Sequence, residues 1–68
     1  MNTKNYIGEQ IKKRRKFLKL TQDDLAEISD ISVRSLKAVE KGEGNPGLRQ
    51  LIKLLDTLGL EIKVGIRQ

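Results

Sequence analysis

The side chains of this chain that could do chemistry on a partner are polar and basic, and they gather between Thr21 and Gly42. This stretch has the pattern of two short helices joined by a tight turn at Asp30. In the later helix, Leu36 and Val39 are three residues apart and share the inward face, which leaves the polar and basic side chains outside. Such an outer face can enter the groove of a duplex, so the stretch predicts a helix-turn-helix that binds DNA.

The composition excludes most catalytic chemistry. The 68 residues include no Cys and no His, which excludes disulfides, thiolate sites, Cys/His zinc sites and His-based catalysis. The acids Asp23, Asp24 and Glu27 lie at a predicted helix start, where acids complement the helix dipole. We therefore expect a protein that is not an enzyme and has no metal or cofactor.

The charge balance is basic, with a formal net charge of +5. A basic surface suits nucleic acid, an anionic membrane surface or an acidic protein. No apolar run reaches the ~18–20 residues that span a bilayer, and the polar start shows no signal peptide. We expect a cytoplasmic, nucleoid-associated protein.

Apolar spacing predicts four helices, over residues 6–18, 22–29, 33–41 and 48–58. Thr21 and Asp24 have the spacing of a capping box before the second helix, and Ser32 is the predicted N-cap of the third. Gly42 and Gly59 follow the ends of the third and fourth helices. The apolar positions expected to form the core are Ile7, Ile11, Phe17, Leu18, Leu25, Ala26, Ile28, Ile31, Leu36, Val39, Leu48, Leu51, Ile52, Leu55 and Leu58.

A run of five cations, from Lys12 to Lys16, occupies the first predicted helix, with Lys19 close behind. It is either a solvated helix face or a set of cations that lie over DNA phosphates. Helix-turn-helix domains take many backbone contacts from flanking elements, so the sequence leaves both interpretations open.

The end of the chain has a different period. Residues 60–67 alternate apolar and polar, which predicts a strand with Leu60, Ile62, Val64 and Ile66 on one face. No other segment has a strand pattern, and a lone strand leaves its backbone groups unpaired. We expect it to pair with the same strand of a second copy in a two-fold dimer. The alternative is a frayed tail that packs Leu60 and Ile62 on its own core.

Taken together, these elements predict one DNA-binding domain over residues 1–68. It would have a flexible start at 1–6, a helical bundle at 7–58 and a dimerisation strand at 60–67. A chain this short builds a small core, and a dimer would add the buried apolar area that the monomer lacks.

From about Ile7 through Leu58 the residues resemble the Xre/Cro family of bacterial and phage helix-turn-helix regulators. The resemblance is carried by Leu20-Thr21-Gln22, Leu25-Ala26 and Val39-Glu40-Lys41-Gly42. It implies an all-α, lambda-repressor-like bundle of about five short helices, here with a C-terminal β-strand that pairs across a dimer. It also implies a homodimeric transcriptional repressor that binds double-stranded DNA at a near-palindromic operator.

The resemblance further implies roles for single residues. Ser32, Val33 and Arg34 match the start of the recognition helix and would contact bases. Arg34 would donate two hydrogen bonds to a guanine, and Val33 would meet a thymine methyl group. Arg15 and Glu40 match a partly buried structural salt bridge. The residues implied to contact the DNA backbone are Gln22, Lys37, Lys41 and Asn45.

Two positions depart from the family pattern. Asp30 takes a turn position that is usually Gly, and Asp tolerates the left-handed backbone region better than most residues. Lys19 stands where many relatives have Gly.

The ending from Leu58 to Val64 resembles HipB-type antitoxins, whose C-terminal strands pair across the dimer. Those proteins repress their own operon and bind a HipA-type kinase toxin. On this resemblance the chain would be an autoregulatory antitoxin with such a toxin as partner. The alternatives are a stand-alone Xre-type regulator and a small helical protein-interaction module whose basic face meets an acidic partner.

Overall fold

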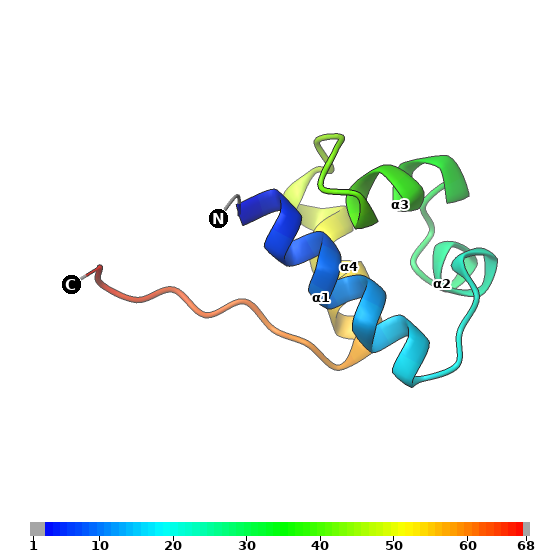
Figure 1. The fold of residues 1–68 in the computed structure, drawn as a ribbon, viewed down its shortest axis with the longest axis horizontal. Helices are drawn as coiled ribbons and strands as arrows, with labels where there is room; N and C mark the ends of the chain where they lie inside the picture. Colours follow the sequence, from blue (N-terminus) through cyan, green and yellow to red (C-terminus); the bar gives the residue numbers. More distant parts are fainter. Residues whose placement is uncertain (1–2, 68) are drawn as a thin grey trace.

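The computed structural model of the chain describes residues 3–67. Its helices are α1 (Thr3–Phe17), α2 (Gln22–Ile28), α3 (Val33–Glu40) and α4 (Leu48–Leu58) (Figure 1). Each of the four helices expected from apolar spacing is present, whereas the expectation of about five is wrong for the described residues. α1 begins at Thr3, inside the start predicted to be flexible at 1–6; Met1 and Asn2 lie outside the described residues.

The four helices form a bundle in which α1 packs against α3 and α4, and α2 packs against the same two helices. In Figure 1 the α2–α3 pair lies at one end, and residues 60–67 leave the bundle at the other. Among the described residues, no helix is long and apolar enough to cross a membrane.

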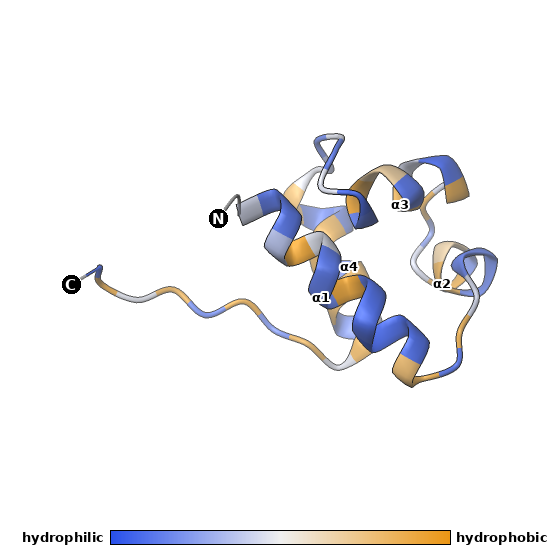
Figure 2. Cartoon of the chain, in the orientation of Figure 1, coloured by the Kyte–Doolittle hydropathy of each residue, from blue (hydrophilic) through white to orange (hydrophobic). Residues whose placement is uncertain are grey.

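The core is aliphatic and has contributions from all four helices (Figure 2). Its buried members are Ile11, Leu25, Ala26, Ile31, Leu36, Val39, Leu54, Leu55 and Leu58. Five residues expected in the core are exposed instead: Phe17 at 71%, Leu48 at 66%, Ile28 at 61%, Ile52 at 43% and Leu18 at 38%. Leu54, absent from the expected set, is fully buried. The buried face of α4 is therefore rotated from the one that leucine spacing indicated, because a leucine-rich helix offers more apolar positions than one face can bury.

The predicted N-caps of α2 and α3 are confirmed. The Asp24 N–H donates to Thr21 Oγ1 at 3.0 Å, and the Thr21 N–H donates to Asp24 Oδ2 at 2.9 Å, which completes a capping box. The hydrogen bond that the Asp24 carboxylate accepts from the Thr21 backbone, followed by its interaction with the Thr21 hydroxyl, holds the pKa of Asp24 below its ordinary value of 3.8. At α3 the Ser35 N–H donates to Ser32 Oγ at 3.0 Å.

Each of the four helices is followed, one or two positions after its last residue, by a residue in the left-handed region. The next backbone N–H then donates back into the last turn of the helix. The returning bonds are Leu20 N–H to Arg15 O (3.0 Å), Ile31 N–H to Ala26 O (3.0 Å), Glu43 N–H to Ala38 O (2.8 Å) and Leu60 N–H to Leu55 O (2.8 Å). The left-handed residue is Gly42 after α3 and Gly59 after α4, but it is Lys19 (φ 60°) after α1 and Asp30 (φ 55°) after α2.

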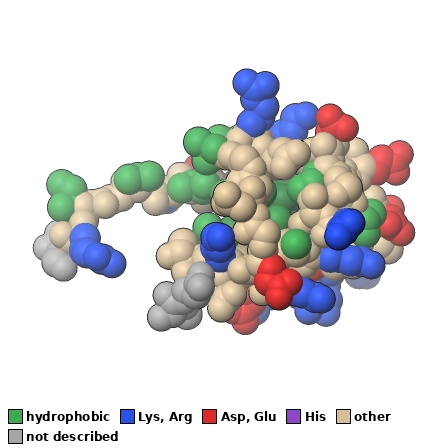
Figure 3. Space-filling model, turned by 90° about the horizontal axis from the view of Figure 1, so that it is seen from above, with side chains coloured by type: hydrophobic (Ala, Val, Ile, Leu, Met, Phe, Trp, Pro, Cys, Tyr) green, Lys and Arg blue, Asp and Glu red, His purple; other side chains and the backbone are tan. Residues whose placement is uncertain are grey.

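Residues 60–67 form an extended C-terminal tail rather than a strand with a buried face. Leu60 is partly buried against the core, but Ile62 is half-exposed, and Val64 and Ile66 are 94% and 91% exposed. Figure 3 shows the hydrophobic side chains of the tail standing clear of the bundle. The expectation of a buried strand face is thus wrong for a single chain, because the described residues include no second strand to complete a ladder.

Candidate nucleic-acid interface

The outer face of α3 carries three exposed cations. Leu36, Val39 and Glu40 turn inward and are buried, while Arg34, Lys37 and Lys41 lie on the opposite face at spacings of three and four. With Ala38 and Glu43, the three cations line a shallow surface hollow. None of the three side chains makes a hydrogen bond or ion pair within residues 3–67. Their charges are therefore open to an external anion.

The three residues implied to contact bases differ in how open they are. Ser32 is exposed, but its hydroxyl caps α3 and donates to Ser35 Oγ at 2.9 Å. Val33 is partly buried and packs against the core. Arg34 is exposed, and within the described residues its guanidinium has no partner. Arg34 is consequently the residue of the three best placed to reach a base edge.

Gln22 and Asn45, the other residues implied to contact the DNA backbone, lie next to α3 on two other elements. Gln22 lies in the first turn of α2, and its Nε2 donates to Glu40 Oε1 at 3.1 Å. Asn45 is exposed in the loop between α3 and α4, where it lines a small hollow together with Ser35 of α3. The structure therefore brings Asn45 to the α3 surface and ties Gln22 to the inner side of α3.

A buried polar network holds α3 in place. Arg15 Nε donates to Glu40 Oε2 at 2.7 Å, and Arg15 Nη2 donates to Glu40 Oε1 at 3.1 Å. Arg15 Nη1 also donates to the Leu20 carbonyl at 2.9 Å, and Gln22 Nε2 donates to Glu40 Oε1. The two charged side chains are only 9% and 3% exposed. The network therefore joins α1, the turn that follows it, α2 and α3 at one buried point.

Gly8 is a positioning residue that the sequence analysis missed. A Cβ at this position would overlap the Val39 carbonyl oxygen and lie 2.9 Å from that of Glu40. The backbones of α1 and α3 therefore touch here, and only glycine permits it. A glycine inside a helix lowers stability by about 1 kcal/mol relative to alanine. Its presence in the middle of a predicted amphipathic helix was therefore the sequence signal for a close approach of two backbones.

The basic run on α1 divides into structural and solvated cations. Arg15 belongs to the buried network, and Arg14 Nε donates to the Leu58 carbonyl at 2.8 Å. The Arg14 guanidinium also lies 4.9 Å from the ring centre of the exposed Phe17. Lys12, Lys13 and Lys16 are exposed. The run is thus neither purely a solvated face nor purely a phosphate-binding surface, because two of its members hold α1 to other parts of the fold.

Comparison with known proteins agrees with this geometry. A model of a helix-turn-helix family matches residues 11–64. Over 56 residues the chain is 38% identical to the cryptic phage CTXphi transcriptional repressor RstR of Vibrio cholerae serotype O1. The match covers 82% of this chain and 50% of that protein, so the chain spans about half the length of its curated relative.

Proposed function

Because the chain belongs to the helix-turn-helix family, we propose that it is a transcriptional repressor that binds a near-palindromic operator as a homodimer. The observation that carries the proposal is the outer face of α3, where Arg34, Lys37 and Lys41 are exposed and have no partner among the described residues. The similarity to a phage transcriptional repressor supports repression as the outcome of binding.

In this function the cations of α3 divide the recognition between them. Arg34, near the helix N-terminus, donates two parallel hydrogen bonds to guanine O6 and N7 and so reads sequence. Lys37 and Lys41 are flexible point charges that neutralise phosphates. Ser32 and Asn45 complete the surface at its edges, while Val33 and Gln22 join it from partly buried positions beside the core and Glu40. Binding weakens steeply with salt, because each neutralised phosphate releases counterions.

Two copies are needed to read a palindrome, with their recognition helices ~34 Å apart. We propose that the C-terminal tails supply the dimer contact by pairing as strands. The alternating apolar residues of the tail, Leu60, Ile62, Val64 and Ile66, support this. In a single chain Ile62 is about half-exposed, and Val64 and Ile66 are almost fully exposed.

The proposal is tested by selecting sheared genomic DNA with the purified protein, in parallel with Arg34→Ala. We expect the protein to recover one near-palindromic site and the variant to lose that preference. Arg49→Ala is the matched control, since it removes the same side chain from an exposed position on α4. Recovery of all fragments alike by every protein would overturn sequence-specific repression and favour a protein-interaction module.

A narrower function, that of an antitoxin which binds a HipA-type kinase toxin and represses its own operon, is supported by the sequence of residues 58–64 and by the exposed tail. It is tested by co-expressing the chain with the product of the neighbouring gene. Co-elution in gel filtration with loss of kinase activity would support it. A neighbouring gene that encodes no kinase, together with a selected site upstream of the chain's own gene, would leave a stand-alone autoregulator.

A further inference from the structure

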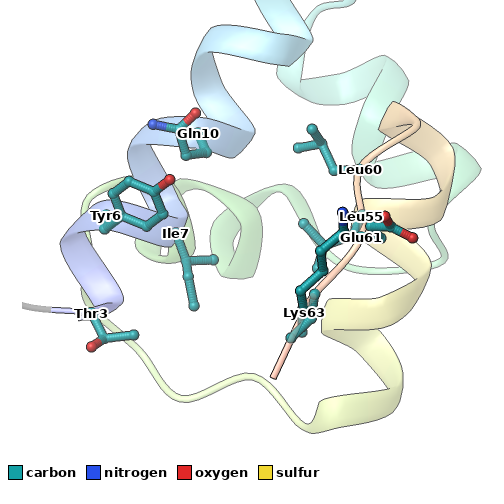
Figure 4. A pocket seen from close by; sticks show the side chains of 9 residues that line it. Thr3, Tyr6, Ile7, Gln10, Leu55, Leu60, Glu61 and Lys63 are labelled. Atoms are coloured by element: carbon teal, nitrogen blue, oxygen red, sulfur yellow. Dashed lines mark ion pairs between the residues drawn. The ribbon is translucent and has the colours of Figure 1, made fainter. Parts of the chain in front are cut away.

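A hollow of about 460 Å³ lies between the first half of α1 and the base of the tail. Figure 4 shows Tyr6 and Ile7 of α1 on one side and Leu55, Leu60 and Lys63 on the other, with open space between them. Tyr6 is 49% exposed, and Ile62, which also lines the hollow, is 48% exposed. The hollow is therefore an apolar surface that the chain itself leaves open.

The tail presents apolar side chains that match this hollow but cannot reach it. Ile66 is four residues beyond Ile62, which is ~13 Å along an extended chain. The tail runs away from the bundle, and both Val64 and Ile66 remain exposed (Figure 1). A second copy can bring the same side chains back, because an antiparallel strand runs in the opposite direction.

Charge selects one register for such a pair. If two tails pair antiparallel about Val64, Glu61 of each stands opposite Arg67 of the other, and Lys63 stands opposite Gly65. Centring the pair on Lys63 places two lysines opposite each other, and centring it on Gly65 places Lys63 opposite Arg67. Directly opposed like charges are destabilising. Parallel in-register pairing has the same fault, because it sets each cation beside its own copy.

The period of the tail excludes the registers that lie between residues. A pair centred between two residues would place even-numbered side chains opposite odd-numbered ones, so that the apolar face of one strand would meet the polar face of the other. A pair centred on Val64 keeps all the apolar side chains on one face. It also places Ile66 of the second copy directly beside Ile62, at the wall of the hollow.

We propose that two copies pair their tails antiparallel about Val64, so that Ile66 of each enters the hollow beside Tyr6 and Ile62 of the other. The inference rests on the homodimer of the proposed function and specifies its interface. The occupant is a second copy because the chain carries both halves of the contact, the open apolar hollow and the exposed apolar tail, together with complementary charges at Glu61 and Arg67.

The absence of native cysteine allows a direct test by disulfide cross-linking. In the proposed register, Val64→Cys links to itself on mild oxidation, because directly opposite Cβ atoms are ~4.5–5.5 Å apart. Lys63→Cys links poorly, because its two copies are diagonal neighbours at ~7–8 Å. Preferential self-linking of Lys63→Cys would overturn the register.

Docking in the hollow is tested by mixing Tyr6→Cys with Ile66→Cys and identifying the mixed disulfide by mass spectrometry. Ile28→Cys mixed with Ile66→Cys is the control, because Ile28 is 61% exposed on α2 and away from the hollow. We expect the Tyr6–Ile66 link to exceed the control. Equal yields, in a protein that sediments as a dimer, would overturn the docking and leave the dimer standing.

A charge swap tests the cross-strand pair without a cysteine. Glu61→Arg and Arg67→Glu should each weaken dimerisation by about 2- to 10-fold, and the double variant should recover most of the loss. An equal or larger loss in the double variant would overturn the pairing. These readouts are independent of DNA, so a dimer with the expected links that selects no operator would contradict only the proposed repressor.

Discussion

The guanidinium of Arg15 and the carboxylate of Glu40, 25 residues apart, share two hydrogen bonds of 2.7 and 3.1 Å inside the bundle. Glu40 is on the inner side of α3, and the cations that would contact DNA are on its outer side. The ion pair therefore fixes the orientation of α3 and of the cations on its outer side. Gln22 adds a third hydrogen bond to the same carboxylate and brings the start of α2 into the arrangement.

Glu40→Ala should lower the free energy of unfolding by about 3–5 kcal/mol, because it leaves Arg15 buried without its partner. Urea denaturation followed by circular dichroism measures the loss. The double variant Arg15→Met with Glu40→Leu should lose much less, since it removes both buried charges. A double variant as unstable as the sum of the single changes would contradict this role.

Arg34→Ala and Lys37→Ala should weaken DNA binding in different ways. The arginine variant should lose ~1–3 kcal/mol on the selected operator and flatten base preference at one position in each half-site. The lysine variant should weaken binding to every duplex alike and reduce the slope of log affinity against log salt by about 1. Titrations on operator and random duplex at several salt concentrations distinguish them. An equal loss for Arg34→Ala on both duplexes would refute its base contact.

Gly8→Ala should destabilise the fold although alanine favours helices. The added Cβ overlaps the Val39 carbonyl oxygen, so α1 and α3 must move apart. Overpacking of this kind costs about 1–3 kcal/mol, which thermal unfolding would detect as a lower Tm. Gly65→Ala is the matched control, because no atom lies within 4 Å of its added Cβ. A Tm unchanged by Gly8→Ala would contradict the close approach.

Lys19→Gly should stabilise the protein. Lys19 has φ 60° at the end of α1, a conformation that costs a residue with a Cβ roughly 1–2 kcal/mol. Part of this gain is offset by the larger entropy of glycine in the unfolded chain, which leaves about 1 kcal/mol. Lys19→Ala removes the charge but keeps the Cβ, so it separates the two effects. If the alanine variant gained as much as the glycine variant, backbone strain would not be the cause.

The capping box should make stability depend on pH through Asp24. Its pKa is lower in the folded state than in the unfolded chain, so its contribution is complete above the unfolded value. That contribution is lost as the pH falls through the folded value. Between about pH 5 and pH 3, the free energy of unfolding should therefore fall less steeply with decreasing pH in Asp24→Asn than in the unchanged protein. Asp23→Asn, which leaves the capping box intact, is the control; identical slopes in all three proteins would rule the effect out.

The four helices and most of their ends could be predicted from local sequence patterns. Caps such as Thr21 with Asp24, and the left-handed residues Gly42 and Gly59, act within a few residues of the chain, so their pattern is visible without the fold. Helical spacing likewise identified α3 and the inward direction of Leu36 and Val39. Local interactions of this kind also sufficed to indicate a helix-turn-helix.

Features that depend on how two elements pack together could not be predicted in this way and were found in the folded chain. The contact of Gly8 with the carbonyl of Val39, the exposure of Phe17 and the rotated buried face of α4 follow from helix packing, which short-range spacing does not encode. The tail shows the same division. Its alternation marks a strand, but a strand needs a partner, and the described chain has none to offer.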